Sequence, residues 1–171
     1  MAHQRAPDLP ESITAGPALS DWMTVKPEWI DFNGHLNMAY YNVLFDEGID
    51  DLYHLMGFGA EYARTRGMTT FVADFRVRYL RELHEGDRVQ CSVQLLDHDA
   101  KRFHSFQQLH HEDGWLAATA EGLTLHVDMS GPRVAPMPPD VKKQVAALQA
   151  AHDALPRPEG VGLPIGIPAK A

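Results

Sequence analysis

The sequence predicts an α+β fold in which one long helix packs on one face of an antiparallel sheet. Two observations lead to this prediction: a helical pattern near residues 38–56, and four alternating segments that follow residue 67. The chain has 171 residues, of which 44% are hydrophobic, so it can form one domain with a substantial core. We expect that domain over residues 21–152, between a flexible arm at 1–20 and a Pro- and Gly-rich tail at 153–171.

The long helix is predicted from apolar residues that recur at intervals of three and four. They are Tyr41, Leu44, Phe45, Gly48, Leu52, Leu55 and Met56. Asn37 is suited to be the N-cap residue, and Gly57 and Gly59 are suited to end the helix. A second helix is expected over residues 140–151, directly after two prolines.

The sheet is predicted from segments in which apolar and polar residues alternate. They cover residues 68–80, 89–95, 103–111 and 115–127. Short polar turns separate the last three, so these strands are expected to form an antiparallel meander. A further strand is expected over residues 22–28, where Pro27 restricts it to an edge position.

Charge and composition exclude several classes of partner. The net charge of −8 disfavours nucleic acid and anionic membranes as partners, because both attract basic surfaces. No apolar run approaches the length of a membrane span, and no secretory signal is recognisable. Cys91 is the single cysteine, and the histidines lack zinc-site spacing. We therefore expect a cytoplasmic enzyme or binding protein that uses no metal and no cofactor.

The densest chemistry lies in the loop that leads into the long helix. Asp31, Asn33, His35 and Asn37 fall within seven residues of one another. The free N–H groups of a helix start can stabilise an oxyanion, and a nearby carboxylate can act as a base or a nucleophile. The loop therefore indicates an acyl-transfer site, although the same residue types also form ordinary turns and caps.

The segment DFNGHLNMAY, residues 31–40, together with Glu47, resembles the D-x-x-G-H-x-N-x-x-Y…E signature of hotdog-fold thioesterases, the 4-hydroxybenzoyl-CoA thioesterase-like group. The resemblance covers roughly residues 20–150 and includes the segments YLREL and EGDRV. It implies a long central helix wrapped by an antiparallel sheet and hydrolysis of an acyl-CoA thioester. It also implies a homodimer or tetramer, with active sites at the dimer interface.

The resemblance assigns roles at the start of the helix. Asp31 stands where many relatives have a catalytic aspartate, which acts either as nucleophile or as base for water. The backbone N–H groups of Asn37 and Met38 match the oxyanion donors of the family. Met38 also marks a departure, since one subgroup has a histidine at this position.

Further roles come from related subgroups. Asn33 and His35 match loop residues of plant acyl-ACP thioesterases, and Glu82 matches their glutamate on a later strand. Glu47 matches the helix carboxylate that other hotdog thioesterases use. We rank Asp31 first among the candidate catalytic residues, then His35 and Asn33, then Glu82 and Glu47.

Residues 97–114 and 125–136 resemble a narrower subgroup, the hotdog thioesterases of carnitine breakdown, which hydrolyse betainyl-CoA. The trimethylammonium group of this substrate favours an aromatic and acidic pocket through cation–π attraction. The candidate aromatic walls are Trp22, Trp29, Phe32, Tyr40 and Tyr41. Lys101 and Arg102 are candidates for binding the CoA phosphates, although they also fit a solvated hairpin tip.

Two alternative functions remain open from sequence. One is a hotdog protein that binds acyl-CoA without cleaving it, because binding and cleaving residues overlap. The other is a hotdog hydratase, whose motif resembles D-x-N-P-x-H. Here His35 stands four positions after Asp31 and the loop has no proline, which disfavours the hydratase.

Overall fold

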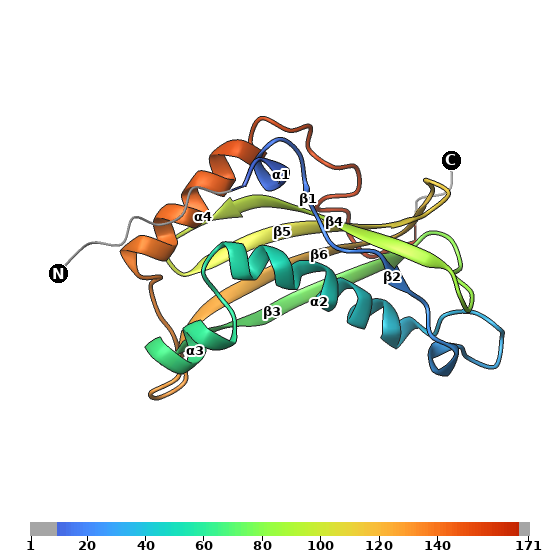
Figure 1. The fold of residues 1–171 in the computed structure, drawn as a ribbon, viewed down its shortest axis with the longest axis horizontal. Helices are drawn as coiled ribbons and strands as arrows, with labels where there is room; N and C mark the ends of the chain where they lie inside the picture. Colours follow the sequence, from blue (N-terminus) through green and yellow to red (C-terminus); the bar gives the residue numbers. More distant parts are fainter. Residues whose placement is uncertain (1–9, 168–171) are drawn as a thin grey trace.

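The computed structural model describes residues 10–167 and confirms the predicted α+β architecture: a long helix, α2, lies across a curved antiparallel sheet (Figure 1). The helices are α1 (Glu11–Thr14), α2 (Met38–Leu55), α3 (Ala60–Arg66) and α4 (Pro139–His152), with a 3-10 turn at Pro27–Trp29. The strands are β1 (Ala18–Leu19), β2 (Met23–Thr24), β3 (Met68–Tyr79), β4 (Arg88–His98), β5 (Arg102–His111), β6 (Leu116–Asp128) and β7 (Arg133–Val134).

The sheet has the strand order β1-β4-β5-β6-β3, with β2 paired to β4 and β7 paired to β6. Strands β4, β5 and β6 form the predicted meander. Strand β3 does not join β4, its neighbour in sequence, but pairs with β6 on the far side of the meander. Within the described residues, the other side of β3 is therefore a sheet edge.

Helix α2 begins and ends as the sequence predicts. The Asn37 side chain accepts a hydrogen bond from Ala39 N–H at 3.0 Å, and Gly57 follows the helix with φ of +88°. The buried face packs on β4, where Gly48 allows a close approach. A Cβ atom on Gly48 would lie 2.4 Å from the Cβ atom of Cys91, so only glycine permits this contact between helix and strand.

The structure differs locally from the sequence predictions at three places. Over residues 22–28 only Met23–Thr24 is a strand, and Pro27 begins a 3-10 turn instead of continuing it. Helix α3 was not predicted, because its short, mostly polar sequence carries little apolar periodicity; Gly59 and Gly67 flank it. Helix α4 confirms the second predicted helix and starts one residue earlier than expected.

Both chain ends contact the sheet within the described residues. In the segment predicted as a flexible arm, Ala18–Leu19 pairs with β4. In the segment predicted as a tail, the N–H of Gly162 donates to the Glu121 carboxylate at 2.8 Å, and Gly160 lies against Phe106. Phe106 and Glu121 are cross-strand partners on the sheet face opposite α2, so the tail crosses that face.

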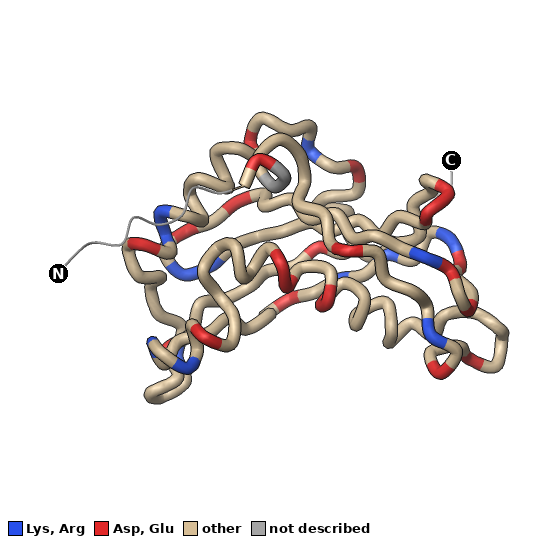
Figure 2. Tube along the Cα trace, in the orientation of Figure 1, with Lys and Arg blue, Asp and Glu red and all other residues tan. Residues whose placement is uncertain are grey.

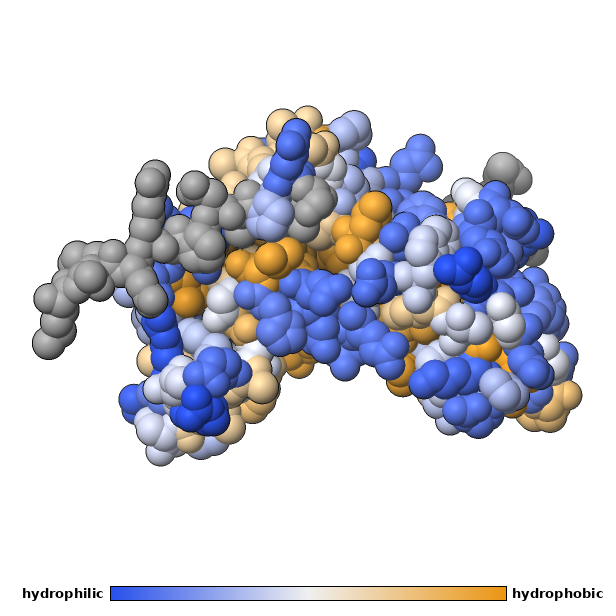
Figure 3. Space-filling view, in the orientation of Figure 1, coloured by the Kyte–Doolittle hydropathy of each residue, from blue (hydrophilic) through white to orange (hydrophobic). Residues whose placement is uncertain are grey.

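No helix within residues 10–167 combines the length and the apolar character that a membrane span needs. Basic and acidic residues alternate along the described trace without forming one basic stripe (Figure 2). Acidic residues are concentrated along α2 (Figure 2), and the space-filling view shows a hydrophilic area over that helix with apolar surface beside it (Figure 3).

Candidate active site

The loop before α2 is closed by its own backbone hydrogen bonds. The N–H of Asp31 donates to His35 O at 2.9 Å, and Ile30 forms a β-bridge with Leu36. Gly34 has φ of +83°, which favours glycine at the tip. The loop is anchored at its end, because Leu36 N–H donates to Leu83 O at 2.7 Å. This long-range bond brings the segment after β3 next to the start of α2.

A cleft of about 490 Å³ opens where these two segments meet, a volume within the range typical of small-molecule sites. Its lining includes five of the residues predicted for catalysis or oxyanion binding: Asp31, His35, Asn37, Met38 and Glu82. The remaining lining residues are Leu36, Tyr41, Tyr79, Leu80 and Arg81. The fold thus brings two carboxylates, an imidazole, a guanidinium and a helix start to one cleft.

The Asp31 carboxylate is partly fixed by its own loop. Its Oδ1 atom accepts a hydrogen bond from Asn33 N–H at 2.8 Å, which is an Asx turn. Asn33 itself is exposed and outside the cleft lining, so it contributes to the turn through its backbone. The Oδ2 atom of Asp31 has no hydrogen-bond partner within residues 10–167.

The two predicted oxyanion donors differ. The N–H of Asn37 donates to Trp29 O at 2.9 Å and is therefore already occupied, which corrects the prediction for this residue. The N–H of Met38, the first residue of α2, has no partner in the described part of the chain. Met38 therefore supplies the free amide at the positive end of the helix dipole.

Glu82 lines the cleft but does not lie on a strand. Strand β3 ends at Tyr79, and the N–H groups of Leu80 and Arg81 both donate to Ala117 O. This turn directs the YLREL segment away from the sheet and toward the loop that carries Asp31.

Arg81 and Tyr79 line the cleft beside the predicted catalytic residues. The Arg81 guanidinium stands 4.0 Å from the ring centroid of Trp115, and Trp115 stacks on His111 at 4.3 Å. The Tyr79 hydroxyl donates to Met38 O at 3.4 Å. Both residues belong to YLREL, the segment that pointed to Glu82.

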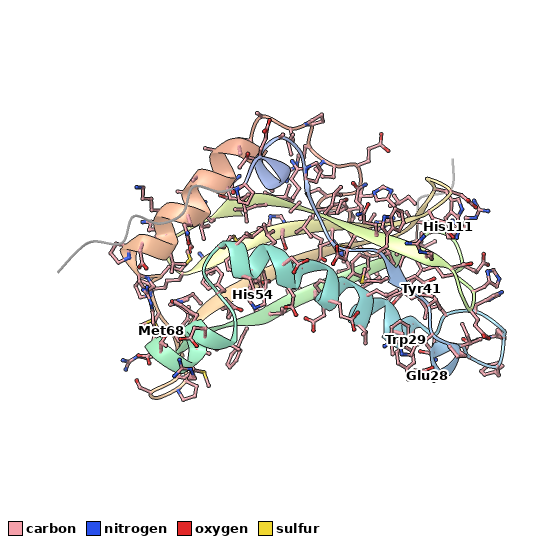
Figure 4. The ribbon with its side chains drawn as sticks, viewed as in Figure 1. Glu28, Trp29, Tyr41, His54, Met68 and His111 are labelled. Atoms are coloured by element: carbon pink, nitrogen blue, oxygen red, sulfur yellow. The ribbon has the colours of Figure 1, made fainter. Side chains whose placement is uncertain are left out.

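The predicted aromatic walls are dispersed. Tyr41 alone lines the cleft; it is buried, its ring meets Tyr79 edge-on, and burial raises the pKa of its phenol. Trp29 and Tyr40 stack on each other at 5.4 Å instead. Trp29 and Tyr41 are seen together at the N-terminal end of α2 in Figure 4. Phe32 is 97% exposed at the loop tip.

Four other predicted residues lie elsewhere in this chain. Glu47 is exposed on α2 and outside the cleft lining. Lys101 and Arg102 lie in and just after the turn between β4 and β5, at the end of β4 far from the Asp31 loop. Arg102 is paired with Asp99 at 2.6 Å, and Trp22 is half exposed beneath Arg88.

Comparison with known proteins identifies a family. The model of a family described as the thioesterase-like superfamily matches residues 25–145. A betainyl-CoA thioesterase from Pseudomonas aeruginosa is 41% identical over 145 residues, which cover 84% of this chain and 91% of that protein. An L-carnitine dehydrogenase/betainyl-CoA thioesterase from Ruegeria pomeroyi is 31% identical over 95% of this chain, and the match spans 33% of that longer protein.

Solved structures agree with this result. A Staphylococcus aureus protein determined in complex with CoA superimposes with a TM-score of 0.80 at 30% identity, covering 86% of this chain and 93% of that one. A putative thioesterase from Pseudomonas putida gives a TM-score of 0.77 at 28% identity, covering 90% and 98% of the two chains.

Proposed function

The chain belongs to the thioesterase-like superfamily, and from this premise we propose that it hydrolyses betainyl-CoA to betaine and CoA. Its fold is the hotdog fold that the sequence resemblance implied, and its class is acyl-CoA thioesterase. The acyl group is the proposed part, supported by the similarity to the Pseudomonas aeruginosa enzyme. Similarity to proteins that join this activity to L-carnitine dehydrogenase supports a role in carnitine breakdown.

The observation that carries the proposed site is the meeting of Asp31 with the free N–H of Met38 in one cleft. The thioester carbonyl is polarised by the Met38 amide and the positive end of α2. Asp31 then either attacks the carbonyl carbon or removes a proton from the attacking water. The tetrahedral oxyanion collapses, the carbon–sulfur bond breaks, and the CoA sulfur leaves and takes a proton. Attack by water gives betaine directly, whereas attack by Asp31 gives a mixed anhydride, which water then hydrolyses to betaine and the free Asp31 carboxylate.

The other lining groups have supporting roles in this proposal. Glu82 and His35 stand beside Asp31 and can accept or return protons during turnover. Glu47 and Asn33 rank below Glu82 and His35. Glu47 is exposed outside the cleft lining, and Asn33 contributes to the turn through its backbone. CoA thioesters are intracellular metabolites, and we place the enzyme in the cytoplasm on that ground.

We also propose that the protein is a homodimer that pairs through β3. This strand lies at the sheet edge, and Phe71 and Val72 expose about half of their side-chain surface there, at 46% and 53%. Edge strands with exposed apolar residues are prone to pair with another chain. Such a dimer would bring the Lys101 and Arg102 turn of one subunit within reach of the partner's cleft.

Thiol release from betainyl-CoA tests the proposal. We expect turnover by the wild-type protein and a loss of about a hundredfold or more in Asp31→Asn, because the carboxylate is the proposed base or nucleophile. Asp21→Asn, an exposed aspartate outside the cleft, is the matched control and is expected to keep its activity.

Three other results would change the assignment. Undiminished release in Asp31→Asn would reject Asp31 and direct attention to Glu82, which lines the same cleft. Binding of betainyl-CoA without release of CoA would support the non-catalytic acyl-CoA-binding protein. Release of CoA from aromatic or medium-chain acyl-CoA, but not from betainyl-CoA, would support the thioesterase activity and reject betaine as the acyl group.

A further inference from the structure

A second cavity lies beside α2, one helical turn beyond the cleft. Its volume is about 330 Å³, and it is lined from α2, β3, β5 and β6. It begins at Asn42, whose side chain donates to Met38 O at 3.4 Å. Because residues four apart share a helix face, the cavity continues along α2 from the proposed oxyanion site. An acyl group whose carbonyl lies at Met38 would extend toward it.

The cavity wall carries one carboxylate, Asp46, and no cationic side chain. Asp46 has no ion-pair partner within residues 10–167. Partial burial, and then the neighbouring charge of Asp50, raise the pKa of the Asp46 carboxyl. The positive charge of a bound cation would favour the ionised carboxylate and so offset both effects, whereas a neutral or anionic group would not.

Aromatic rings complete the wall. Tyr53 contributes from α2 and Phe75 from β3. The Tyr53 hydroxyl lies 3.2 Å from the Thr124 hydroxyl, and its ring makes an edge contact with Phe103. Burial raises the pKa of Tyr53 to about 12, so its phenol stays neutral near neutral pH. Asp46 is thus the single negative charge of an otherwise neutral and largely apolar wall.

We propose that this cavity is the acyl subsite and binds a quaternary ammonium group, with Asp46 as its counter-ion and Tyr53 and Phe75 as its aromatic walls. Quaternary ammonium ions have no N–H to donate, so recognition relies on aromatic faces and charge. Met38 and Asp46 are eight residues apart on α2, about 12 Å along the helix axis. The Asp46 side chain leans back toward the helix start, which leaves room for a short acyl chain and its bulky head group.

The inference rests on the proposed function and names the residues that select the cation. It differs from the sequence prediction, since none of the five aromatic residues named there lines this cavity. Those five residues lie at positions 22–41, whereas Tyr53 and Phe75 come from α2 and β3 and meet in one cavity only in the folded chain.

The test compares betainyl-CoA with tert-butylacetyl-CoA, in which a neutral carbon replaces the ammonium nitrogen at the same shape. In wild-type protein we expect the ratio of kcat/KM values to favour the cation. In Asp46→Asn this ratio is expected to fall by about tenfold or more, because the counter-ion is lost and the shape is kept. Asp51→Asn, an exposed aspartate of α2 outside the cavity wall, should keep the wild-type ratio. Phe75→Leu should lower it through loss of the ring.

Binding of non-hydrolysable thioether analogues of the same two compounds, measured by calorimetry, separates this inference from the proposed function. If the wild-type protein cleaves neither thioester but binds the cationic analogue more tightly, in an Asp46-dependent manner, the subsite stands and the catalytic function fails. Equal binding of the two analogues to wild-type protein would overturn the cation subsite. So would an Asp46→Asn variant that keeps the wild-type ratio of kcat/KM values and the wild-type ratio of analogue affinities.

Discussion

At the scale of single residues, the cleft depends on which polar groups are already hydrogen-bonded within the protein and which remain free. Asn37 caps α2 with its side chain and donates its N–H to Trp29 O. The free amide at the start of the helix is therefore that of Met38. One carboxylate oxygen of Asp31 accepts the hydrogen bond of the Asx turn, and the other has no hydrogen-bond partner within residues 10–167. Asp31 therefore holds the loop in shape with one oxygen and offers the other to a ligand, and Met38 offers its N–H.

Arg81 is the cation of the cleft, and we predict that it binds the CoA phosphates. Its guanidinium is held over the Trp115 ring and has no carboxylate partner among the described residues. We expect Arg81→Gln to raise KM for acyl-CoA by about tenfold, through loss of a charge-assisted contact. The corresponding N-acetylcysteamine thioester, which lacks the phosphates, should keep its KM.

Steady-state kinetics with the two thioesters give this measurement. Arg64→Gln is a suitable control, because Arg64 is exposed and paired with Glu61 on α3. Equal losses with both thioesters would mean that Arg81 acts on the fold or on the chemistry. An unchanged KM with both thioesters would mean that other basic residues bind the phosphates, and Lys101 and Arg102 are the first candidates.

At the scale of elements, a carboxylate of β6 helps to join the C-terminal tail to the sheet. Glu121 on β6 accepts hydrogen bonds from Gly162 N–H at 2.8 Å and from Arg76 at 3.2 Å, and it pairs with His104 at 2.8 Å. Burial alone would raise the pKa of Glu121, but these partners together hold it below the usual value. Because the folded pKa lies below the unfolded one, ionised Glu121 stabilises the fold above about pH 4.5.

We predict that Glu121→Gln lowers the free energy of unfolding by about 1 kcal/mol near neutral pH. This deficit relative to wild type should persist above the unfolded pKa and shrink as the pH falls through the folded pKa, where the wild-type carboxylate becomes protonated. Urea denaturation at a series of pH values measures it.

Glu61→Gln provides the comparison for this prediction, since Glu61 forms an exposed pair with Arg64 and should matter by less than about 0.5 kcal/mol. A deficit in Glu121→Gln that is constant with pH would mean that packing of the tail, and not the charge, provides the stabilisation.

At the scale of the whole molecule, both cavities lie along α2 and both use residues of β3 or of the segment that follows it. A dimer that pairs β3 with its copy would place the two α2 helices and the four cavities around one interface. Assembly would then cover the openings of both cavities, which face solvent in the single chain. It would also strengthen the interaction of Asp46 with a cation by excluding water.

The dimer predicts a solution mass of twice the chain mass of 19.1 kDa, measured by light scattering after gel filtration. Phe71→Glu should shift the protein toward the monomer, because it puts a charge on the exposed apolar edge. Leu19→Glu, at a residue that is also exposed but lies on β1 at another edge, should remain dimeric. A monomeric wild type, or dissociation by Leu19→Glu alone, would contradict pairing through β3.

The sequence by itself determined the elements whose pattern is local. Helix α2 follows from the spacing of Tyr41, Leu44 and Phe45, and the meander β4-β5-β6 follows from alternation and short turns, because such periodicities decide which face of an element is buried. The Asp31–Met38 loop was also recognisable, since its residues are neighbours in sequence.

Only the tertiary structure decided what distant segments do together. The pairing of β3 with β6 and the bond from Leu36 N–H to Leu83 O bring Arg81 and Glu82 to the Asp31 loop. The crossing of α2 over β3 brings Asp46 and Phe75 to one cavity. Local pattern cannot specify these meetings, because they depend on which of several compatible strands pairs with which, and that choice is made by the packing of the whole core.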